Sequence, residues 1–456
     1  MRQILLRDTL SGRLRELKPR NPGRVGIYAC GPTVYARIHV GNARPYVVFS
    51  LLKRFLVHEG YDVTLVVNIT DINDKIYAAA RDNPLSSAEL ATAMTEAYVR
   101  DTNELGLGRP DHEPLATEMI VPIIELIEQL VESGHAYAAG GDVYFSVSSY
   151  PRYGQLSHRR VEELDQGEGV EGAQRKRDAA DFALWKAYKP SEDTSWDSPW
   201  GPGRPGWHIE CSAMAEKLLG LDFEIHGGGT DLIFPHHENE AAQTDAARRT
   251  PLARLWVHNG MLNLDREKMA KSQGNIFLLH EAIAAYGRDA LIAYFCGAHY
   301  RQPIDFDHER LSVAQAGVRR IREAVRGLVP GASPSWSPPL RERFFAALAD
   351  DFNTPTALAV VFEWAREANR ERADAGGERV GDEDLREMLA VLGLDNLLEQ
   401  AHSEPPAELL ELARAREQAR QAGDYAKADR LRERIKAMGW EVRDGPSGPE
   451  LLPPQG

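Results

Sequence analysis

Two short apolar segments, Val25–Cys30 and Val63–Ile69, flank a longer amphipathic segment, Pro45–His58, and this order constrains the fold most. The short segments are rich in β-branched residues, whereas the segment between them has the periodicity of a helix. Two strands joined by a helix pair in parallel, because the helix returns the chain to the end of the sheet where the first strand began. The sequence therefore predicts an α/β domain with a Rossmann-type parallel sheet.

The rest of the chain predicts an insertion in this domain and a helical C-terminal part. The insertion contains a helix, Ile120–Ser133, and a strand, Asp142–Val147, before the α/β pattern resumes near Asp222. Further helices are expected at 311–328, 340–349, 355–372 (with Thr354 as N-cap), 384–392, 409–421 and 425–438. Pro-containing linkers are expected at 331–339 and 401–407, and a disordered tail at 445–456.

We expect five regions in chain order. They are the first half of the catalytic domain (1–117), an inserted connective subdomain (118–200), the second half of the catalytic domain (201–310), a helical bundle (311–400) and a small C-terminal domain (401–456).

Composition excludes several classes of protein. No apolar stretch of the 456 residues approaches the roughly 20 needed to cross a bilayer, and the N-terminal apolar run is too short for a secretory signal. Three unpatterned cysteines fit a reducing cytoplasm better than a disulfide framework. The net charge of -14 disfavours general affinity for nucleic acids, so a nucleic-acid site would have to be a local basic patch.

Cys30, Cys211 and the run Pro235–Glu240 together offer ligands for one metal ion. Pro235 suits the first position of a helix, in which His236 and Glu240 would project from the same face. Two thiolates, an imidazole and a carboxylate suit a tetrahedral zinc site. On the residues alone an alternative stays open, in which both cysteines are small buried hydrophobic residues.

Two further motifs suit phosphate chemistry. His39-Val40-Gly41-Asn42 follows the first strand, where a helix N-terminus attracts phosphate and Gly41 leaves room for a flat base. Lys268 and Lys271 lie three residues apart in a loop that suits a cationic flap over a polyphosphate. Taken singly, the first motif is also typical of a surface turn and the second of a solvated face.

These motifs resemble those of the class I aminoacyl-tRNA synthetases, and among them the cysteinyl-tRNA synthetase family. His39–Asn42 is similar to the family's HIGH signature and Lys268–Ser272 to its KMSKS loop, with Asn42 and Ala270 as mild departures. The more specific matches, in the family's order, are Ala29–Tyr35, Asn68–Lys75, Ser195–Gly201, Gly206–Ser212, His226–Glu240 and Ala349–Pro355. The resemblance extends over nearly the whole chain.

The resemblance implies activation of L-cysteine with ATP and Mg²⁺, and transfer of cysteine to tRNA(Cys). It implies one zinc ion per chain on Cys30, Cys211, His236 and Glu240. His39, Asn42, Lys268 and Lys271 would stabilise charge during catalysis, and with Gly41 they would bind ATP. An amino-acid pocket would be lined by Gly31, Thr70, Trp207, His226 and Asp231. His237, about 100° from His236 on an ideal helix, is expected to be structural.

Zinc coordination would distinguish cysteine from serine, which packing alone does poorly. The predicted insertion is too short for the editing domain of larger class I enzymes. We expect a cytoplasmic monomer. Cys296, between two residues of an apolar run, is expected to be a buried hydrophobic residue.

An alternative from the same superfamily is a mycothiol-pathway ligase, which joins cysteine to an amino-sugar, and a non-catalytic zinc-binding or tRNA-binding relative is another. The hairpin 409–438 carries eight Lys/Arg against five Asp/Glu in an otherwise acidic chain, which favours a tRNA-contacting element over an ordinary charged surface. The basic residues are Arg414, Arg416, Arg420, Lys427, Arg430, Arg432, Arg434 and Lys436.

Overall fold

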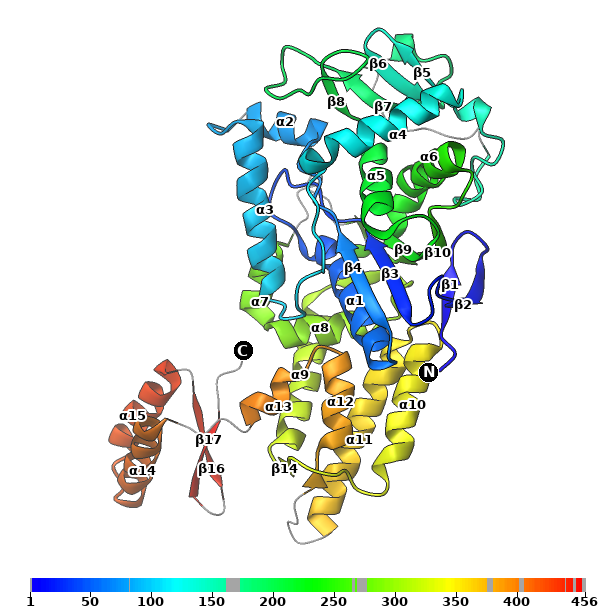
Figure 1. Cartoon of the computed structure of the whole chain (residues 1–456). Coiled ribbons are helices and arrows are strands. Elements are labelled where there is room, and N and C mark those ends of the chain that lie inside the picture. The colour runs from blue at the N-terminus through cyan, green and yellow to red at the C-terminus, as the bar shows by residue number, and fades with distance from the viewer. Residues whose placement is uncertain are drawn as a thin grey trace.

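The computed structural model describes residues 2–81, 83–160, 173–264, 267–268, 277–374, 380–401, 406–438, 440–445 and 448–452. Figure 1 shows an elongated molecule with a sheet domain and its insertion above, a helical bundle below and a small C-terminal lobe beside the bundle. In the described ranges, every helix is too short or too polar to cross a membrane.

A four-stranded parallel sheet forms the centre of the upper part. Its strands are β10 (Ala253–Asn259), β9 (Phe223–Gly229), β3 (Arg24–Ala29) and β4 (Asp62–Val67), in that order. Helix α1 (Val40–His58) connects β3 to β4 as the sequence predicts, and contributes Phe49 and Phe55, both fully buried, to the core. The predicted α/β class is thereby confirmed.

Short strands and helices complete the catalytic part. The strands are β1 (Leu5–Asp8), β2 (Arg13–Glu16), β11 (Leu262–Leu264), β12 (Glu267–Lys268) and β13 (Ile304–Phe306). The helices are α5 (Trp207–Leu219), α6 (Glu238–Arg248), α7 (Leu279–Tyr286) and α8 (Arg288–Cys296).

The segment between β4 and α5 contains helices and a separate sheet. The helices are α2 (Asp74–Arg81), α3 (Ser87–Asn103) and α4 (Ile120–Glu132). The sheet is antiparallel, with strands β5 (Ala136–Ala139), β6 (Asp142–Phe145), β7 (Phe182–Ala187) and β8 (Gly203–Pro205). Its apolar face packs on α4, and Figure 1 shows it capping the molecule at the end where β3 and β4 terminate.

The lower part is helical. Its helices are α9 (His308–Val325), α10 (Ser337–Ala349), α11 (Thr354–Asp374), α12 (Glu383–Val391) and α13 (Asn396–Ala401), with a two-strand contact between β14 (Leu328–Val329) and β15 (Val380–Gly381). Trp364, fully buried, donates through its indole N–H to Ser337 Oγ at 2.6 Å and fixes α11 against α10.

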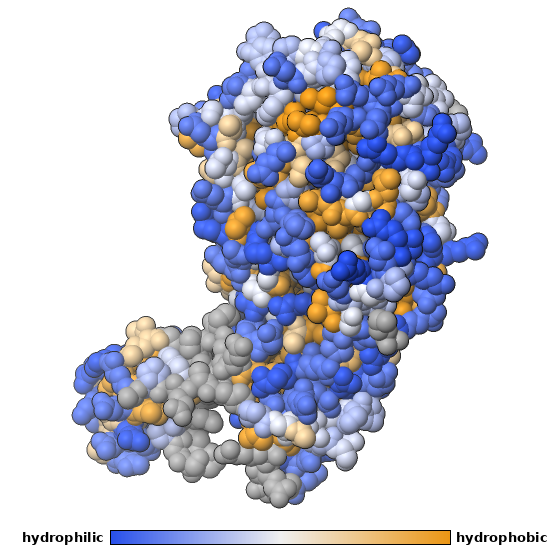
Figure 2. Space-filling model, in the orientation of Figure 1, coloured by the Kyte–Doolittle hydropathy of each residue, from blue (hydrophilic) through white to orange (hydrophobic). Residues whose placement is uncertain are grey.

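The C-terminal lobe contains α14 (Ala407–Gln421), α15 (Tyr425–Ala437), β16 (Glu441–Gly445) and β17 (Gly448–Leu452). A small core of Leu409, Leu412, Ile435 and Val442 joins the two helices to the strands. Six of the eight basic residues are exposed, whereas Arg416 is only 6% exposed and packs inside the lobe. The lobe presents a mostly hydrophilic surface in Figure 2.

Four local predictions are wrong. Strand β17 pairs with β16 within the stretch expected to be a disordered tail; 453–456 lie outside the described residues. Helix α10 begins at Ser337, inside the expected linker. The N-terminal capping contact of α11 comes from Asn353, whose Oδ1 accepts from the Thr356 N–H at 3.2 Å, rather than from Thr354.

The fourth concerns Pro235, which does not begin an α-helix. Residues Ile233–His237 form a π-helical turn, labelled η6, with Phe234 in an extended conformation, and α6 starts only at Glu238.

Candidate active site

A pocket of about 240 Å³ opens at the carboxyl ends of the four parallel strands. Ala29, Val67, Gly229 and Asn259, the last residues of these strands, all line it. Ligands of open parallel sheets bind at this edge, because the loops that follow adjacent strands diverge there. The pocket therefore lies where the fold favours a substrate site.

Half of the fourteen predicted site residues line this pocket. Those that line it are Cys30, Gly31, His39, Gly41, Asn42, Trp207 and Asp231. Thr70 and His226 do not line it: both are buried, at 1% and 0% exposure. Thr70 joins the loops after β3 and β4, since its N–H donates to Pro32 O at 3.1 Å and its carbonyl accepts from the Val34 N–H at 3.1 Å.

Gly31 is required by close backbone packing. A Cβ atom here would lie 1.7 Å from the backbone oxygen of Asn68. The Gly31 N–H also donates to Asn68 Oδ1 at 2.9 Å. The floor of the pocket thus depends on a contact that only glycine permits at this position.

The segment His39–Asn42 forms the start of α1. The His39 ring lies directly against Gly41, where an added Cβ would be 2.9 Å from the imidazole. The Asn42 side-chain oxygen accepts from the His39 N–H at 3.3 Å. The Val40 N–H donates to Phe277 O at 2.9 Å, so not every amide of this helix start is available to a ligand.

The hydrogen bond from Val40 to Phe277 brings the chain that follows the lysine loop next to the His39–Asn42 motif. Phe277 is the first described residue after the lysine loop, and Leu279 N–H donates back to Ile38 O at 3.1 Å. The chain that leaves the loop is thereby fixed beside His39. Lys268 has a described backbone in β12, which pairs with β11, whereas Lys271 lies outside the described residues.

Arg44 holds in place a turn that forms part of the pocket lining. Its guanidinium, 1% exposed, donates to the carbonyls of Gly260, Met261 and Gln302 at 2.6, 3.0 and 2.7 Å. It also donates to Tyr300 O at 3.1 Å and His299 O at 3.4 Å. This one side chain on α1 thus holds the turn after β10, whose residues Gly260 and Met261 line the pocket.

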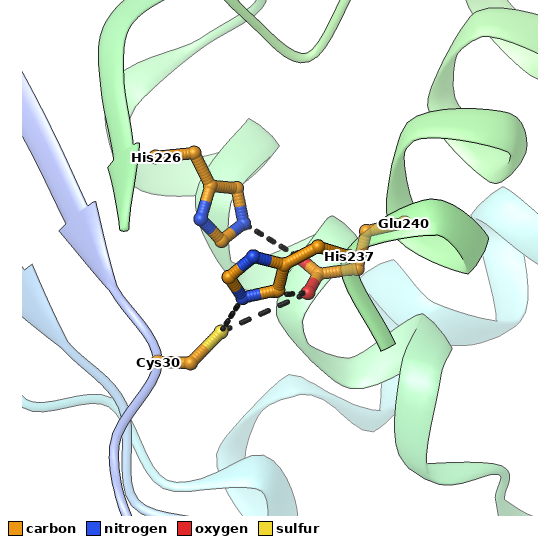
Figure 3. Close-up of side chains that lie close together, drawn as sticks. All are labelled: Cys30, His226, His237 and Glu240. Atoms are coloured by element: carbon orange, nitrogen blue, oxygen red, sulfur yellow. Dashed lines mark hydrogen bonds and ion pairs between the residues drawn. The ribbon is translucent and has the colours of Figure 1, made fainter. Parts of the chain in front are cut away.

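A cluster of metal-ligand side chains lies beneath the pocket. The ligand atoms of Cys30, Cys211, His236 and Glu240 all lie within 4.8 Å of one another, and all four residues are buried. A second, overlapping set replaces Cys211 and His236 by His226 and His237. Figure 3 shows the second set, with Cys30 at the end of β3 and His226 on β9 facing Glu240 and His237.

The distances within the first set fit a tetrahedral zinc site. Sulfur ligands about 2.3 Å from zinc lie about 3.8 Å apart in a tetrahedron, and a sulfur and a carboxylate oxygen about 3.6 Å apart. The Sγ atoms of Cys30 and Cys211 are 3.9 Å apart, and Cys30 Sγ is 3.7 Å from Glu240 Oε1. His236 Nε2 lies 3.1 Å from the same oxygen.

His237 reaches the cluster although the sequence predicts that it points away. Its Nε2 lies 3.3 Å from Cys30 Sγ, and its Nδ1 lies 2.7 Å from His258 Nε2. The prediction assumed α-helical geometry, which η6 does not have. His226 Nε2 lies 2.8 Å from Glu240 Oε2, so His226 contacts the carboxylate of Glu240, which belongs to both sets.

Burial sets the protonation of this cluster. It raises the pKa of the Cys30 thiol well above its usual range, and it also raises the pKa of Cys211. It lowers the pKa of His236 to about 3, so that this imidazole is neutral and able to bind a metal. A dication would supply the positive charge that two thiolates and a carboxylate require.

Trp207 joins the cluster to the pocket. Its ring stacks on His236, with centroids 4.2 Å apart and planes at 17°, and it also lines the pocket. The Asp231 carboxylate lies close to Gly229, where an added Cβ would be 2.5 Å from Asp231 Oδ1.

Sequence reasoning missed several lining residues: Tyr35, Lys75, Asn259 and Met261. Tyr35 and Lys75 lie within motifs that carry the resemblance, and Asn259 ends a strand, but no spacing assigned them a role. Cys296 is 2% exposed and lies in the main core, as the sequence predicts.

Comparison with known proteins identifies the family. A model of the tRNA synthetases class I (C) catalytic domain matches residues 16–316, a DALR domain model matches 343–396, and a cysteinyl-tRNA ligase anticodon binding domain model matches 402–448. The cysteine–tRNA ligase of Halorhodospira halophila is 47% identical over 458 residues, which cover 98% of each chain. That of Pseudothermotoga lettingae is 44% identical and covers 97% of each.

Solved structures agree on the fold. Mycobacterium tuberculosis methionyl-tRNA synthetase in complex with methionyl-adenylate superposes with a TM-score of 0.60 at 16% identity, over 83% of this chain and 89% of that one. The amino-sugar ligase alternative is not favoured, because the relatives that span the chain are cysteine–tRNA ligases and the C-terminal match is to their anticodon binding domain. The chain belongs to the cysteine–tRNA ligase family of class I aminoacyl-tRNA synthetases.

Proposed function

We propose that this protein activates L-cysteine with ATP and transfers it to tRNA(Cys), with one zinc ion selecting the amino acid. The observation that carries the proposal is the convergence of the ligand atoms of Cys30, Cys211, His236 and Glu240 in one cluster, of which Cys30 also lines the pocket. Such a donor set, with two soft sulfurs, favours zinc over the hard cations.

Zinc on these four residues would take the substrate thiolate as an additional ligand and would discriminate against the harder hydroxyl of serine. Cys30 also lines the pocket, and His236 stacks on Trp207 in the wall, so the ligand set adjoins the space for the amino acid. Asp231 would bind the substrate ammonium and Gly31 would leave room for it. Thr70 and His226 would support this pocket from behind rather than touch the substrate.

The adenylate step needs no protein nucleophile. The cysteine carboxylate attacks the α-phosphorus of ATP, and the bond to pyrophosphate breaks. His39 and Asn42, at the pocket end of α1, would donate hydrogen bonds to phosphate oxygens, and Gly41 would allow the base to approach. Lys268 and Lys271 would neutralise the polyphosphate as charge moves to the leaving group, together with the Mg²⁺ that accompanies ATP.

The tRNA would extend from the pocket to the C-terminal lobe. The basic residues exposed on α14 and α15 support contact with its phosphates. We also propose that the chain is divided into the five regions predicted from its sequence. A monomer in the cytoplasm is also proposed, and the three unpatterned cysteines favour that reducing compartment.

The proposal is tested by charging. Purified protein is incubated with total tRNA, ATP, Mg²⁺ and labelled cysteine, and an amino-sugar acceptor is offered in a parallel reaction. We expect label on tRNA alone. Label on the amino-sugar and none on tRNA would replace this function by the ligase alternative.

A further inference from the structure

Lys75 and Tyr35 form a pair at the rim of the pocket that the proposed chemistry does not use. Lys75 Nζ lies 5.7 Å from the centre of the Tyr35 ring, within the range of a cation–π contact. Both residues line the pocket; Lys75 is exposed and Tyr35 is half-buried. The pair therefore presents a cation and an aromatic ring to a ligand in the pocket.

The positive charge of Lys75 is not compensated by its acidic neighbour. Asp74 is engaged elsewhere: its Oδ2 accepts from Lys186 Nζ at 2.8 Å, and its Oδ1 pairs with Arg204. Among the residues that the structure describes, no carboxylate forms an ion pair with Lys75. An anion that reaches the rim thus meets an available ammonium group.

Lys75 and Lys268, the described lysine of the loop, follow different edge strands of the sheet in the chain. Lys75 belongs to α2, which follows β4, whereas the lysine loop follows β10 and β11. Strands β4 and β10 are the two edges of the four-stranded sheet. If Lys268 and Lys271 hold the polyphosphate of ATP, Lys75 is available to a different anion.

Helix α2 is fixed against the insertion by contacts on both sides of Lys75 in the chain. Besides the Asp74 contacts with β7 and β8, Tyr77 Oη lies 2.6 Å from Thr194 Oγ1, in the segment between those strands. Figure 1 shows α2 beside the inserted sheet. Lys75 is therefore at the junction of the sheet domain and the insertion, where an extended polyanion that contacts both would enter the pocket.

We propose that Lys75 and Tyr35 bind the 3′-terminal nucleotide of the tRNA. The ammonium group pairs with the phosphate of that nucleotide, which positions the chain end without reading its sequence. The Tyr35 ring provides a stacking surface for the terminal nucleoside. This inference rests on the proposed function, because it requires a tRNA acceptor.

The test separates the two steps of the reaction in the full-length protein. Cysteine-dependent pyrophosphate exchange reports activation, and single-turnover transfer from the enzyme-bound adenylate to tRNA reports the second step. Lys75→Ala should slow transfer by about tenfold or more, as expected for a lost charge-assisted contact, and leave exchange within about twofold. Lys75→Arg should retain most of the transfer rate. Lys217→Ala, at an exposed position on α5 outside the pocket, is the matched control and should change neither step.

Tyr35 is tested in the same assays. Tyr35→Phe should transfer as the unmodified protein does, because the ring remains, whereas Tyr35→Leu should be slower in transfer only. Equal losses of exchange and transfer in Lys75→Ala would overturn the proposal and assign Lys75 to ATP. No loss in either step would overturn it as well.

The proposed contact is identified by measuring how tightly the protein binds tRNA that lacks its 3′-terminal nucleotide. Removal of the 3′-terminal nucleotide from tRNA should weaken binding to the unmodified protein but add little to the defect of Lys75→Ala, since both changes remove the same interaction. Full additivity of the two effects would contradict the assignment. If the unmodified protein charges no tRNA at all, the proposed function itself fails, and this outcome is distinct from either result above.

Discussion

The Sγ atoms of Cys30 and Cys211 lie 3.9 Å apart although 181 residues separate them in the chain. Cys30 directly follows the last residue of β3, and Cys211 lies in the first turns of α5. Both are buried, at 8% and 1% exposure. Two sulfurs at this separation, with an imidazole and a carboxylate beside them, have the geometry of one tetrahedral metal site.

We therefore predict that the protein contains about one zinc ion per chain and that Cys211→Ser largely removes it, because a hydroxyl is a far poorer ligand than a thiolate. Elemental analysis of protein that has not been treated with a chelator measures the content. Cys296→Ser is the matched control, since Cys296 is equally buried but lies outside the cluster, and it should keep its zinc. Protein without zinc, in either the unmodified or the control form, would contradict the assignment.

The lysine loop gives a second prediction. Lys271→Ala should slow cysteine-dependent pyrophosphate exchange by about two orders of magnitude, because a donor to the transition state is lost. Cysteine affinity, measured by equilibrium binding, should change little. Comparable losses in both quantities would indicate that Lys271 has a structural role instead.

Arg44 gives a prediction about stability. Lys cannot replace the planar fork of donors of Arg44, so Arg44→Lys leaves the carbonyls of Gly260, Tyr300 and Gln302 without this partner. Each unsatisfied carbonyl should lower the free energy of unfolding by about 1–3 kcal/mol. Thermal unfolding should show a clearly lower Tm. Arg54→Lys is the control, because Arg54 on the same helix donates to one carbonyl, that of Ala390, and is partly exposed. Similar Tm values for both variants would show that the Arg44 contacts contribute little.

The C-terminal lobe gives a fourth prediction. Truncation after Ala401 should leave pyrophosphate exchange nearly intact, since every residue that lines the pocket precedes α9. Aminoacylation should fall mainly through a raised KM for tRNA, and tRNA binding should depend less steeply on salt because phosphate contacts are lost. Undiminished charging by the truncated protein would show that α14 and α15 do not contact tRNA.

Much of this architecture could be predicted because the relevant signals are local. The alternation of strand, helix and strand predicted β3, α1 and β4, and helical periodicity predicted α9 to α12, α14 and α15 within a few residues. Helix α3 also has a local signal, because Ser86 and Glu89 form a capping box at its start. The pairing of β16 with β17 depends on packing against α14, which no local pattern reveals.

The site was predictable to a lesser extent. The meeting of Cys30, Cys211, His236 and Glu240 agrees with what the family motifs imply, whereas the approach of His237 to Cys30 could not be anticipated, because the π-helical turn η6 replaces the expected α-helix. Thr70 and His226 belong to the right motifs but lie behind the pocket. The position of a side chain relative to a cavity depends on tertiary packing rather than on spacing.

The most direct test of the account is the ratio of cysteine to serine activation by the zinc-containing protein. Pyrophosphate exchange with each amino acid gives the two values of kcat/KM. If coordination of the thiolate selects the substrate, cysteine should be preferred by far more than the roughly 10–200-fold that a small difference in an apolar pocket provides. A preference within that range, or one that is the same in Cys211→Ser, would contradict selection by the metal.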